Sequence, residues 1–493
     1  MLKGIAIMKI SKKKVVTTGL AVALAAAMVL GGGTYAYLQG TTDDVINNFN
    51  TNKVLVTLSE TTGSDYNIIP GTEQSKDPII TVNNTVPSYV YAIVTDNTDG
   101  LVDYTIAEGW TELEGWNVGA TKVYYREVAK DADPKTFPVL KDNKVTYDAA
   151  LDNDGMLNPD GSLKDGVNLT FTAHAIQKDG FTSAKEAFEN AYSAVSSTED
   201  LTTALQAGKS VVLTGDVEVS ADTIEATKSP ELNLNGQTLT INEGGSTILQ
   251  QGQSLTMENG TLNYTAAPGQ GSQVAIALQE DSELTLKNVA MTTPAGASPL
   301  FVSNGVNKAT LNVIDSEIKT NDNYCISTNA SNNQTGQNIT INVKNSTLVA
   351  SHSTLDTTAI LFNIPGTLNI ENSKITADRQ TVINRCGTVN IKNSTLTCTA
   401  KFNGANKDKY ENANWGSGNE VPMAALVVGN RSNPNSYPYD ATATLSGVTF
   451  DVPENFTEIY AAAFNRHTTT ISNGGNYDQI KVASDDSSTI IIK

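Results

Sequence analysis

The C-terminal half of the chain contains an internal repeat, which constrains its fold more than any other feature. Each copy reads apolar-x-apolar-x-Asn-Ser/Gly-x-apolar, and a polar marker recurs after 24, 29, 27, 30, 27 and 21 residues. The markers are Asn235, Asn259, Asn288, Asp315, Asn345, Asn372 and Asn393. Repeats of this length are typical of solenoids, in which each coil buries its apolar side against its neighbours. The pattern predicts a right-handed parallel β-helix with three strands per coil and about nine coils.

The recurring asparagines look like a row of functional side chains, but their chemistry favours a structural role. Asn tolerates the left-handed backbone conformation that a sharp turn between strands requires, and stacked Asn side chains can form hydrogen-bond ladders. The step from Asn393 to the degenerate copy at Ser446 is 53 residues, which exceeds one coil. We expect an inserted loop at residues 400–420 to account for the excess.

Charge and cysteine content exclude some functions. The net charge is −19, so we expect no binding to nucleic acid, whose phosphates such a surface repels. The three cysteines, Cys325, Cys386 and Cys398, are odd in number and lack the short spacing of disulfide frameworks and zinc sites. We interpret them as small buried thiols of the repeat region.

The N-terminus has the features of an export signal. Four lysines at positions 9 and 12–14 precede an apolar run from Val15 to Leu30, which is short for a membrane span. Small residues at Thr34 and Ala36 predict cleavage after Ala36, so that residues 1–36 would meet the membrane only during export. An uncleaved membrane anchor is the alternative.

Two regions lie between the signal and the repeat. Residues 37–181 contain five strand-like segments separated by turn residues, which predicts a β-sandwich or jelly roll. Residues 182–208 begin with the capping box Ser183–Glu186 and contain two short amphipathic helices. We expect this connector to cover the open end of the first coil with Leu201 and Leu205. The β-helix would then occupy residues 209–493 of an all-β protein.

Two segments carry a family resemblance. Residues 31–38 (GGGTYAYL) and 171–181 (FTAHAIQKDGF) resemble the TasA/camelysin family of Gram-positive bacteria, whose signal peptides are cut by a SipW-type signal peptidase. The resemblance covers residues 9 to about 195, and the coils that follow are similar to pectate-lyase-like β-helices. It implies a jelly-roll subunit of cell surfaces and biofilm matrix that polymerises by lending a strand to its neighbour.

The segment from Tyr37 to Asn52 would be the lent strand, although a mobile tail is an equally good interpretation of its polar sequence. Camelysin is described as a metalloprotease. The chain has no His-Glu-x-x-His motif, and His174 is the one histidine of residues 37–181, which argues against protease activity.

One acidic loop suggests a calcium site. Asp152, Asp154 and Asp160 lie beside glycines, as the carboxylates of calcium loops do. Their spacing does not match an EF-hand, and no glutamate closes the loop. Asp-Gly and Pro-Asp-Gly are also common turn sequences, so an ordinary turn is the alternative.

A row of arginines is the candidate ligand site of the coils. Arg385, Arg431 and Arg466 each follow the Asn that ends a strand, so we expect them to stack on one face of successive coils. Three aligned guanidiniums would suit a carboxylated or sulfated glycan. A solvated surface row is the alternative.

The sequence suggests a surface function and no catalytic residue. The Gly-His-Gly and Arg-Ile-Lys motifs of polygalacturonase-like families are absent, which predicts that the chain is not an enzyme. We expect a secreted protein of the cell surface or biofilm matrix, with self-association into fibres and adhesion to a glycan or cell-wall polymer. The alternative is a secreted carbohydrate-active β-helix enzyme, either a polysaccharide lyase or a hydrolase.

Overall fold

The computed structural model describes residues 53–493, apart from the segments 64–65, 133–134, 159–163, 165–166, 221–223, 225–229, 243–246, 266–272, 329–336, 352–357, 379, 400–423, 431–438, 455–456, 474–475 and 478. The chain divides into two compact units, Met1–Thr51 and Asn52–Lys493, and the described residues belong to the second. The predicted export signal and its cleavage residue Ala36 lie outside the described residues.

The first part of the described chain consists of antiparallel sheets around an apolar core. One sheet has the strand order β1-β3-β7 and the other the order β5-β6-β4-β9. We call them the sheet pair. Because side chains alternate along a strand, Val90, Ala92 and Val94 of β4 enter the shared core together with Ile80 and Phe171. The bounds are β1 Val54–Ser59, β2 Glu73–Ser75, β3 Ile79–Asn84, β4 Ser88–Asn97, β5 Thr111–Val118, β6 Thr121–Val128, β7 Thr136–Pro138, η1 Lys141–Asn143, β8 Lys144–Thr146, α2 Asn153–Met156 and β9 Asn168–Gln177.

The opposite face of β4 is covered by the helix α3, Ala184–Ala191. The helix begins after Ser183, whose Oγ accepts a hydrogen bond from the Glu186 backbone N–H at 3.1 Å, as the capping box predicts. Phe188 is fully buried, and its ring lies 4.9 Å from that of Tyr91 and 4.7 Å from that of Trp116. Both faces of β4 are therefore buried, which makes this strand the centre of the first part of the chain.

The stacked coils begin earlier than the repeat indicates. β10, Tyr192–Val195, follows α3 directly and pairs in parallel with β11, Ser210–Leu213. Between them, α4, Thr198–Gln206, places Leu201 and Leu205 in the core of the coils, in the covering position expected for them. The stack therefore includes residues that the sequence assigns to the connector, 182–208.

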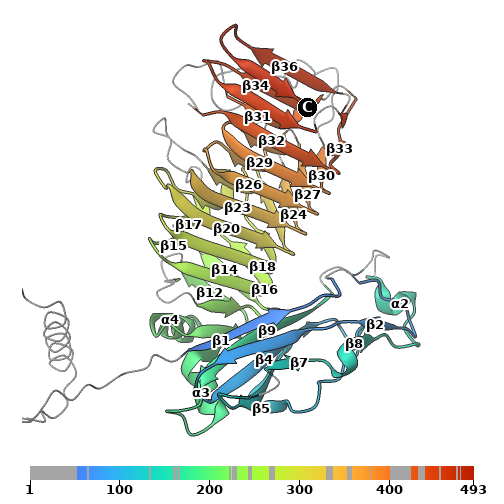
Figure 1. The fold of residues 1–493 in the computed structure, drawn as a ribbon, viewed down its shortest axis with the longest axis vertical. Helices are drawn as coiled ribbons and strands as arrows, with labels where there is room; N and C mark the ends of the chain where they lie inside the picture. The colour runs from blue at the N-terminus through green and yellow to red at the C-terminus, as the bar shows by residue number, and fades with distance from the viewer. Residues whose placement is uncertain are drawn as a thin grey trace, which may run out of the picture. The chain divides into compact units, whose positions relative to one another are not determined.

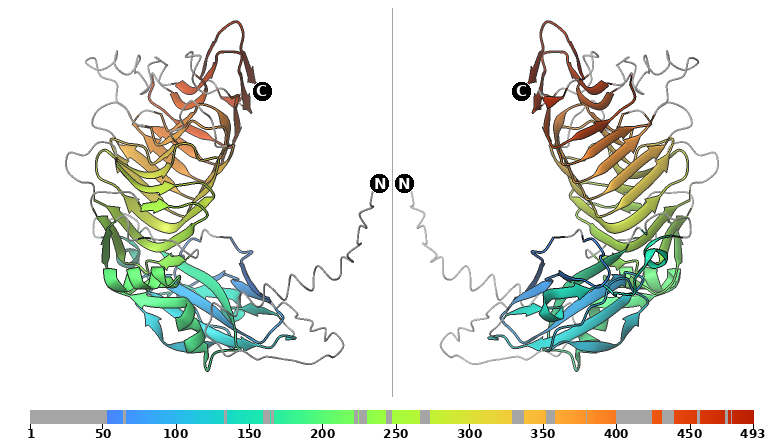
Figure 2. Two further views of the ribbon diagram at one scale, coloured as in Figure 1. Left: turned by 90° about the vertical axis from the view of Figure 1, so that its left-hand side faces the viewer. Right: turned by 90° about the vertical axis from the view of Figure 1, so that its right-hand side faces the viewer.

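The described coils form two long parallel sheets (Figure 1). One sheet contains 19 strands, from β10 to β37, and the other contains nine, from β15 to β36. From β20 to β34 each coil supplies two strands to the first sheet and one to the second, and each strand pairs in register with its equivalent in the next coil. Figure 2 shows these coils from two sides, stacked in chain order.

The remaining coil strands have the following bounds: β12 Val217–Ser220, β13 Glu231–Asn233, β14 Thr238–Asn242, β15 Thr247–Leu249, β16 Ser254–Tyr264, β17 Gln273–Leu278, β18 Ser282–Thr292, β19 Ala297–Val302, β20 Lys308–Ile314, β21 Glu317–Asn321, β22 Ile326–Thr328, β23 Asn338–Lys344, β24 Thr347–Ser351, β25 Ile360–Phe362, β26 Thr367–Glu371, β27 Lys374–Ala377, β28 Val382–Asn384, β29 Gly387–Lys392, β30 Thr395–Cys398, β31 Ala424–Gly429, β32 Ala441–Ser446, β33 Thr449–Asp451, β34 Thr457–Ala463, β35 Thr468–Ser472, β36 Ile480–Ser484 and β37 Thr489–Ile492.

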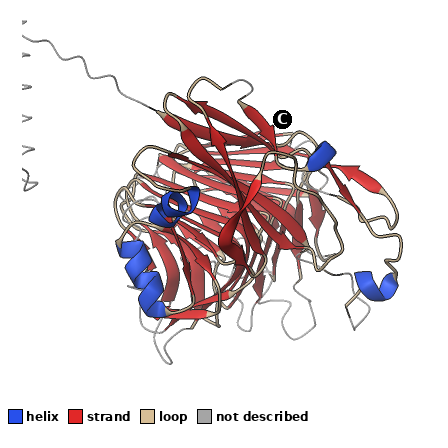
Figure 3. Cartoon of the chain, turned by 90° about the horizontal axis from the view of Figure 1, so that it is seen from below, coloured by secondary structure: helices blue, strands red, loops and turns tan. Residues whose placement is uncertain are grey.

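The interior of the coils is a continuous apolar column. Leu311, Ile341, Leu368 and Val389 occupy equivalent positions in four successive coils, and each is at most 1 % exposed. The three cysteines are buried, as predicted, and burial raises the pKa of each thiol. The described chain is thus all-β apart from short helices (Figure 3), and its coils are built from parallel sheets.

The marker residues adopt the conformation that the sequence predicts. All seven have a left-handed backbone, with φ between 48° and 61°. Their amides also form parts of a ladder: Asn372 Nδ2 donates to Asn345 Oδ1 at 3.2 Å, and Asn345 Nδ2 donates to Asp315 Oδ1 at 2.9 Å. The structural interpretation of the row is therefore confirmed.

Two substitutions of Asn372 should separate its conformation from its hydrogen bond. Asn372→Ala combines a left-handed alanine with the loss of the ladder bond, and we expect a loss of about 2 kcal/mol in the free energy of unfolding. Asn372→Gly loses the bond alone and should cost about 1 kcal/mol or less. Urea unfolding of both variants measures the difference. Equal losses would show that backbone conformation contributes nothing at this turn.

Candidate functional site

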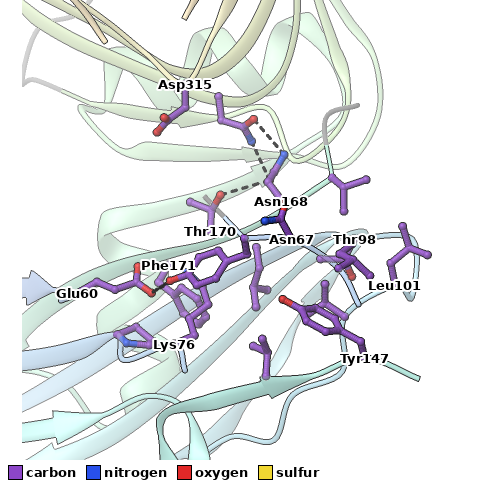
Figure 4. A pocket seen from close by; sticks show the side chains of 18 of the residues that line it. Glu60, Asn67, Lys76, Thr98, Leu101, Tyr147, Asn168, Thr170, Phe171 and Asp315 are labelled. Carbon is purple, nitrogen blue, oxygen red and sulfur yellow. Dashed lines mark hydrogen bonds and ion pairs between the residues drawn. The ribbon is translucent and has the colours of Figure 1, made fainter. Parts of the chain in front are cut away.

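A pocket of about 790 Å³ lies where the sheet pair meets the first coils. Figure 4 shows its lining, in which Glu60, Lys76, Tyr147 and Phe171 come from the sheet pair and Asp315 comes from a coil turn. The volume is in the range of small-molecule sites, about 300–1,000 Å³. Residues more than 200 positions apart in the sequence therefore contribute to one cavity, which makes it the best candidate for a functional site in the described chain.

One wall of the pocket is lined by residues of the apolar core of the sheet pair. Tyr147 and Phe171 are core residues with 4 % and 7 % of their surface exposed, and Leu58, Ile68 and Leu169 pack beside them or line the same wall. Apolar and aromatic groups of this kind give a ligand a surface for contact without hydrogen bonds.

A fixed ion pair lies next to the apolar wall. Lys76 is 8 % exposed, and its Nζ donates to Glu60 Oε1 at 2.7 Å. The same Nζ lies 4.8 Å from the centroid of the Tyr66 ring and 5.6 Å from that of Phe171. Two rings and one carboxylate thus hold the ammonium group in place. Burial raises the pKa of the Tyr66 hydroxyl, which also donates to Gly63 O at 2.8 Å.

The wall opposite comes from the coils. Lys287 and Asn288 of β18 line it together with Asp315 and Asn345, which follow β20 and β23, and three of these four are marker residues of the repeat. Asn288 and Asn168 of β9 exchange two amide hydrogen bonds, at 2.9 and 3.0 Å. All seven marker residues have the left-handed backbone that the sequence predicts, and three of them also line the pocket.

Beyond the pocket, titratable groups, two of them buried and two half-buried, join the sheet pair to the coils. We call this group the seam cluster: His174 of β9, Tyr192 of β10, Glu231 of β13 and Glu258 of β16. Tyr192 donates to Glu231 Oε2 at 2.8 Å, and the His174 ring lies edge-on at 5.1 Å from the Tyr192 ring. Thr172 of β9 donates to Glu258 Oε1 at 3.4 Å.

Burial shifts the proton affinities of the seam cluster. It raises the pKa of Glu258, which is 5 % exposed. The charge of Lys287, which is in register with Glu258, lowers this pKa, as does the hydrogen bond from Thr172, whereas the charge of Glu231 raises it further. Burial also lowers the pKa of His174, against the opposing charge of Glu231. The contact between the two parts of the chain therefore favours uncharged forms of both groups.

The predicted calcium loop looks like an ordinary turn where it is described. Asp152 Oδ1 accepts a hydrogen bond from the Gly155 backbone N–H at 3.1 Å, at the start of α2. Among the described residues, no group of three or more His, Cys, Asp or Glu side chains is placed to hold a metal ion. Asp154 lies within α2, but Asp160 lies outside the described residues, so the site with all three carboxylates stays a prediction.

The predicted arginine row does not form as expected. β28 lies in register with β31, and β31 with β34, so the positions equivalent to Arg385 are Gly429 and Ala462. Arg385 is 1 % exposed, whereas Arg466 is exposed and lies four residues beyond the equivalent position. Arg431 lies outside the described residues. Arg385 and Arg466 therefore do not share one face, and binding of a ligand by these arginines stays untested.

No protein-family model and no curated protein matches the chain. Among solved structures, it is similar to the catalytic unit of a thermostable GH87 α-1,3-glucanase from Streptomyces thermodiastaticus strain HF3-3, with 13 % identity, a TM-score of 0.27, and coverage of 89 % of this chain and 95 % of that chain. For the catalytic domain of a GH87 α-1,3-glucanase in complex with nigerose, the identity is 10 %, the TM-score 0.18, and the coverage 88 % and 98 %. With such low TM-scores, no catalytic residue, substrate or mechanism is transferred.

These comparisons correct one prediction. The sequence predicts that the chain is not an enzyme, but the solved structures that it resembles are catalytic units of glycoside hydrolases. The prediction of a non-enzymatic protein is therefore not upheld. Among the described residues, no helix combines the length and apolar character needed to cross a membrane.

Proposed function

We propose that this chain is an exported carbohydrate-active protein that takes up a segment of polysaccharide in the pocket between the sheet pair and the coils. In this proposal the coils form a right-handed parallel β-helix, and the sheet pair is a TasA/camelysin-like jelly roll. A SipW-type signal at residues 1–36 directs export to the extracellular space. The observation that carries the proposal is the composition of the pocket.

The pocket combines the two kinds of contact that a sugar needs. A pyranose ring has apolar C–H faces and a rim of hydroxyl groups, so it is bound by flat apolar or aromatic side chains together with amides and charged groups. Tyr147 and Phe171 supply the first kind of contact. Asn288, Asp315 and the Glu60–Lys76 pair supply the second.

The pocket also contains carboxylates that a glycoside hydrolase would require. Among its lining residues, Glu60 and Asp315 are the acidic ones, and they come from opposite walls. Hydrolysis of a glycosidic bond uses two carboxyl groups on either side of the bond. The arrangement supports a test for cleavage of a bound glycan, with these two residues as the first to be changed.

Removing polar groups from the coil wall should weaken glycan binding. In the double variant Asn288→Gly and Asp315→Gly, we expect affinity for the best ligand to fall about tenfold, because two or more hydrogen bonds are lost. Glycine keeps the left-handed turns intact. Calorimetry of the full chain with a panel of neutral and acidic oligosaccharides, α-1,3-glucan fragments included, measures the affinity.

The matched control is Asn372→Gly with Asn393→Gly. These residues belong to the same row and have the same backbone conformation, but they do not line the pocket. Equal loss of binding in both double variants would refute the pocket as the site. Release of reducing ends, measured in parallel for the parent and for Glu60→Gln, tests cleavage. The proposal fails as a whole if no oligosaccharide of the panel binds.

A further inference from the structure

Equivalent strands of six successive coils in the 19-stranded sheet each present two small polar side chains outward. The strands are β20, β23, β26, β29, β32 and β35, and each contributes two residues separated by one core residue. The pairs are Thr310 and Asn312, Thr340 and Asn342, Thr367 and Asn369, Thr388 and Asn390, Thr442 and Thr444, and Thr470 and Ser472. We call these twelve residues the Thr-Asn face.

The Thr-Asn face is a regular array. Every strand pairs in parallel with the next, and Thr lies opposite Thr and Asn opposite Asn through the first four coils. All twelve side chains are half-buried. Equivalent side chains therefore repeat about every 4.8 Å from coil to coil, and the two columns are about 7 Å apart along the strands.

The asparagines of this face need an explanation beyond strand formation. Asn is unfavourable in the middle of a strand, unlike Thr. Here the amides form a ladder: Asn342 Nδ2 donates to Asn312 Oδ1 at 2.8 Å, Asn369 to Asn342 at 2.8 Å and Asn390 to Asn369 at 2.9 Å. At Asn342 and Asn369 the ladder uses one N–H and one lone pair of an amide that has two of each. The Asn312 amide N–H groups are instead occupied by Glu283 and Thr285 of the preceding coil. The ladder therefore orients the amides and leaves capacity for a ligand from Asn342 onward.

The Thr-Asn face carries no charge. None of the twelve residues is charged, although the chain has 52 acidic and 33 basic side chains. Charge borders the face on two sides: Glu283, in register with Thr310 in the preceding coil, accepts a hydrogen bond from Asn312 Nδ2 at 3.2 Å, and the adjacent column contains the ion pair of Glu371 and Lys392 at 2.8 Å. A surface of this kind gives no advantage to a phosphorylated, sulfated or carboxylated ligand, and it suits a neutral ligand with many hydroxyl groups.

We infer that the Thr-Asn face binds a strand of an uncharged, regularly repeating polysaccharide that lies along the stacking direction of the coils. Successive sugar rings then meet successive coils, because a pyranose unit and the spacing between coils are of similar length. Threonine methyl groups contact the C–H faces of the rings, and hydroxyl and amide groups bond to the sugar hydroxyls. The inference deepens the proposed function and rests on it for the class of ligand, but it uses none of the pocket residues.

The test removes hydroxyl groups without changing side-chain shape. In the triple variant Thr340→Val, Thr367→Val and Thr388→Val, valine keeps the β-branched form that strands favour. The control changes Thr347, Thr376 and Thr397 to valine; these half-buried residues lie in β24, β27 and β30 of the same coils but outside the face. Both full-length proteins are sedimented with insoluble α-1,3-glucan, cellulose and chitin and titrated with neutral oligosaccharides of increasing length.

We expect the face variant to lose about tenfold in affinity for the best neutral polymer and the control to lose less than twofold. For the parent, affinity should rise with each added sugar up to about the six coils of the array. Equal effects of the two triple variants, equal affinity for polyuronates, or no dependence on chain length would each overturn the inference. So would self-association of the parent that the face variant abolishes without any polysaccharide binding.

The pocket double variant separates this inference from the proposed function. Retained binding to the insoluble polymer, with lost binding of short oligosaccharides, supports two distinct sites. Loss of both in the pocket variant, with neither affected in the face variant, refutes the Thr-Asn face and leaves the pocket as the site.

Discussion

Gly429→Ala should destabilise the coils by about 4 kcal/mol or more, the largest effect expected of a single substitution here. Gly429 ends β31 with a φ of 117°, which side-chain-bearing residues rarely adopt. A Cβ at this position would overlap the backbone carbonyl oxygen of Ala462 in β34 and would lie 2.8 Å from Thr469 Oγ1. The obstacle is the backbone of the next coil, so no side-chain rotation relieves it.

Gly305→Ala is the matched control for this prediction. Gly305 also has a positive φ, 84°, but no heavy atom beyond its own chain neighbours lies within 4 Å of the added Cβ. The substitution should lower the free energy of unfolding by about 1–2 kcal/mol, the cost of placing alanine in a left-handed backbone conformation. Urea unfolding, together with limited proteolysis to locate any opened coils, compares the two variants. Similar losses for both would mean that close approach of the coils at Gly429 is not a source of strain.

Glu258→Gln should make the stability of the protein less dependent on pH. Because burial raises the pKa of Glu258, the folded protein retains a proton that the unfolded chain releases near the ordinary value of 4.5. The parent therefore loses stability as pH rises above that value, until Glu258 ionises in the folded state as well. Glutamine keeps a group that can accept the Thr172 hydrogen bond and does not titrate. We expect the free energy of unfolding of the variant to exceed that of the parent by on the order of 1 kcal/mol at about pH 8. At about pH 4 the two free energies should be nearly equal.

Thermal unfolding between these pH values measures the difference. The groups that face Glu258 are Glu231, Lys287 and Thr172, and none of them is changed. Glu283→Gln is the control, since Glu283 is an exposed residue of the neighbouring strand β18. A variant that remains less stable than its parent at high pH would show that ionised Glu258, paired with Lys287, stabilises the contact. His174 acts in the opposite direction: its lowered pKa predicts a loss of stability in the parent as pH falls below about 6.5.

The sequence predicts the coils well because their determinants are local. The apolar alternation defines the strands, and the marker residues define a turn that needs a left-handed backbone. Both recur often enough to reveal the period. β10 was missed because its four residues follow a helix directly and carry no marker; only pairing with β11 shows that it belongs to the stack.

The sites were harder to predict because they depend on register and on distant contacts. The prediction of an arginine row rests on a shared Asn-Arg dipeptide. The hydrogen-bond register of the strands instead places Gly429 beside Arg385. The pocket joins residues near position 60 to residues near position 300, and Asn288 has the same local sequence pattern as Asn372, which lies outside the pocket. Only the packing of β9 against the coils distinguishes them.

The position of β10 has a consequence for how the chain folds. Tyr192 stacks on Phe188 at 4.5 Å in the aromatic cluster of the sheet pair, and the same residue pairs with Ser210 in the first parallel contact of the coils. Packing against the aromatic cluster of the sheet pair thus fixes β10, and its strand edge is available for the next segment. Each later coil then closes a loop of only some 20–30 residues, a small entropic cost that grows slowly with length. The coils are therefore suited to form one after another, each on the strand edge left by the coil before it.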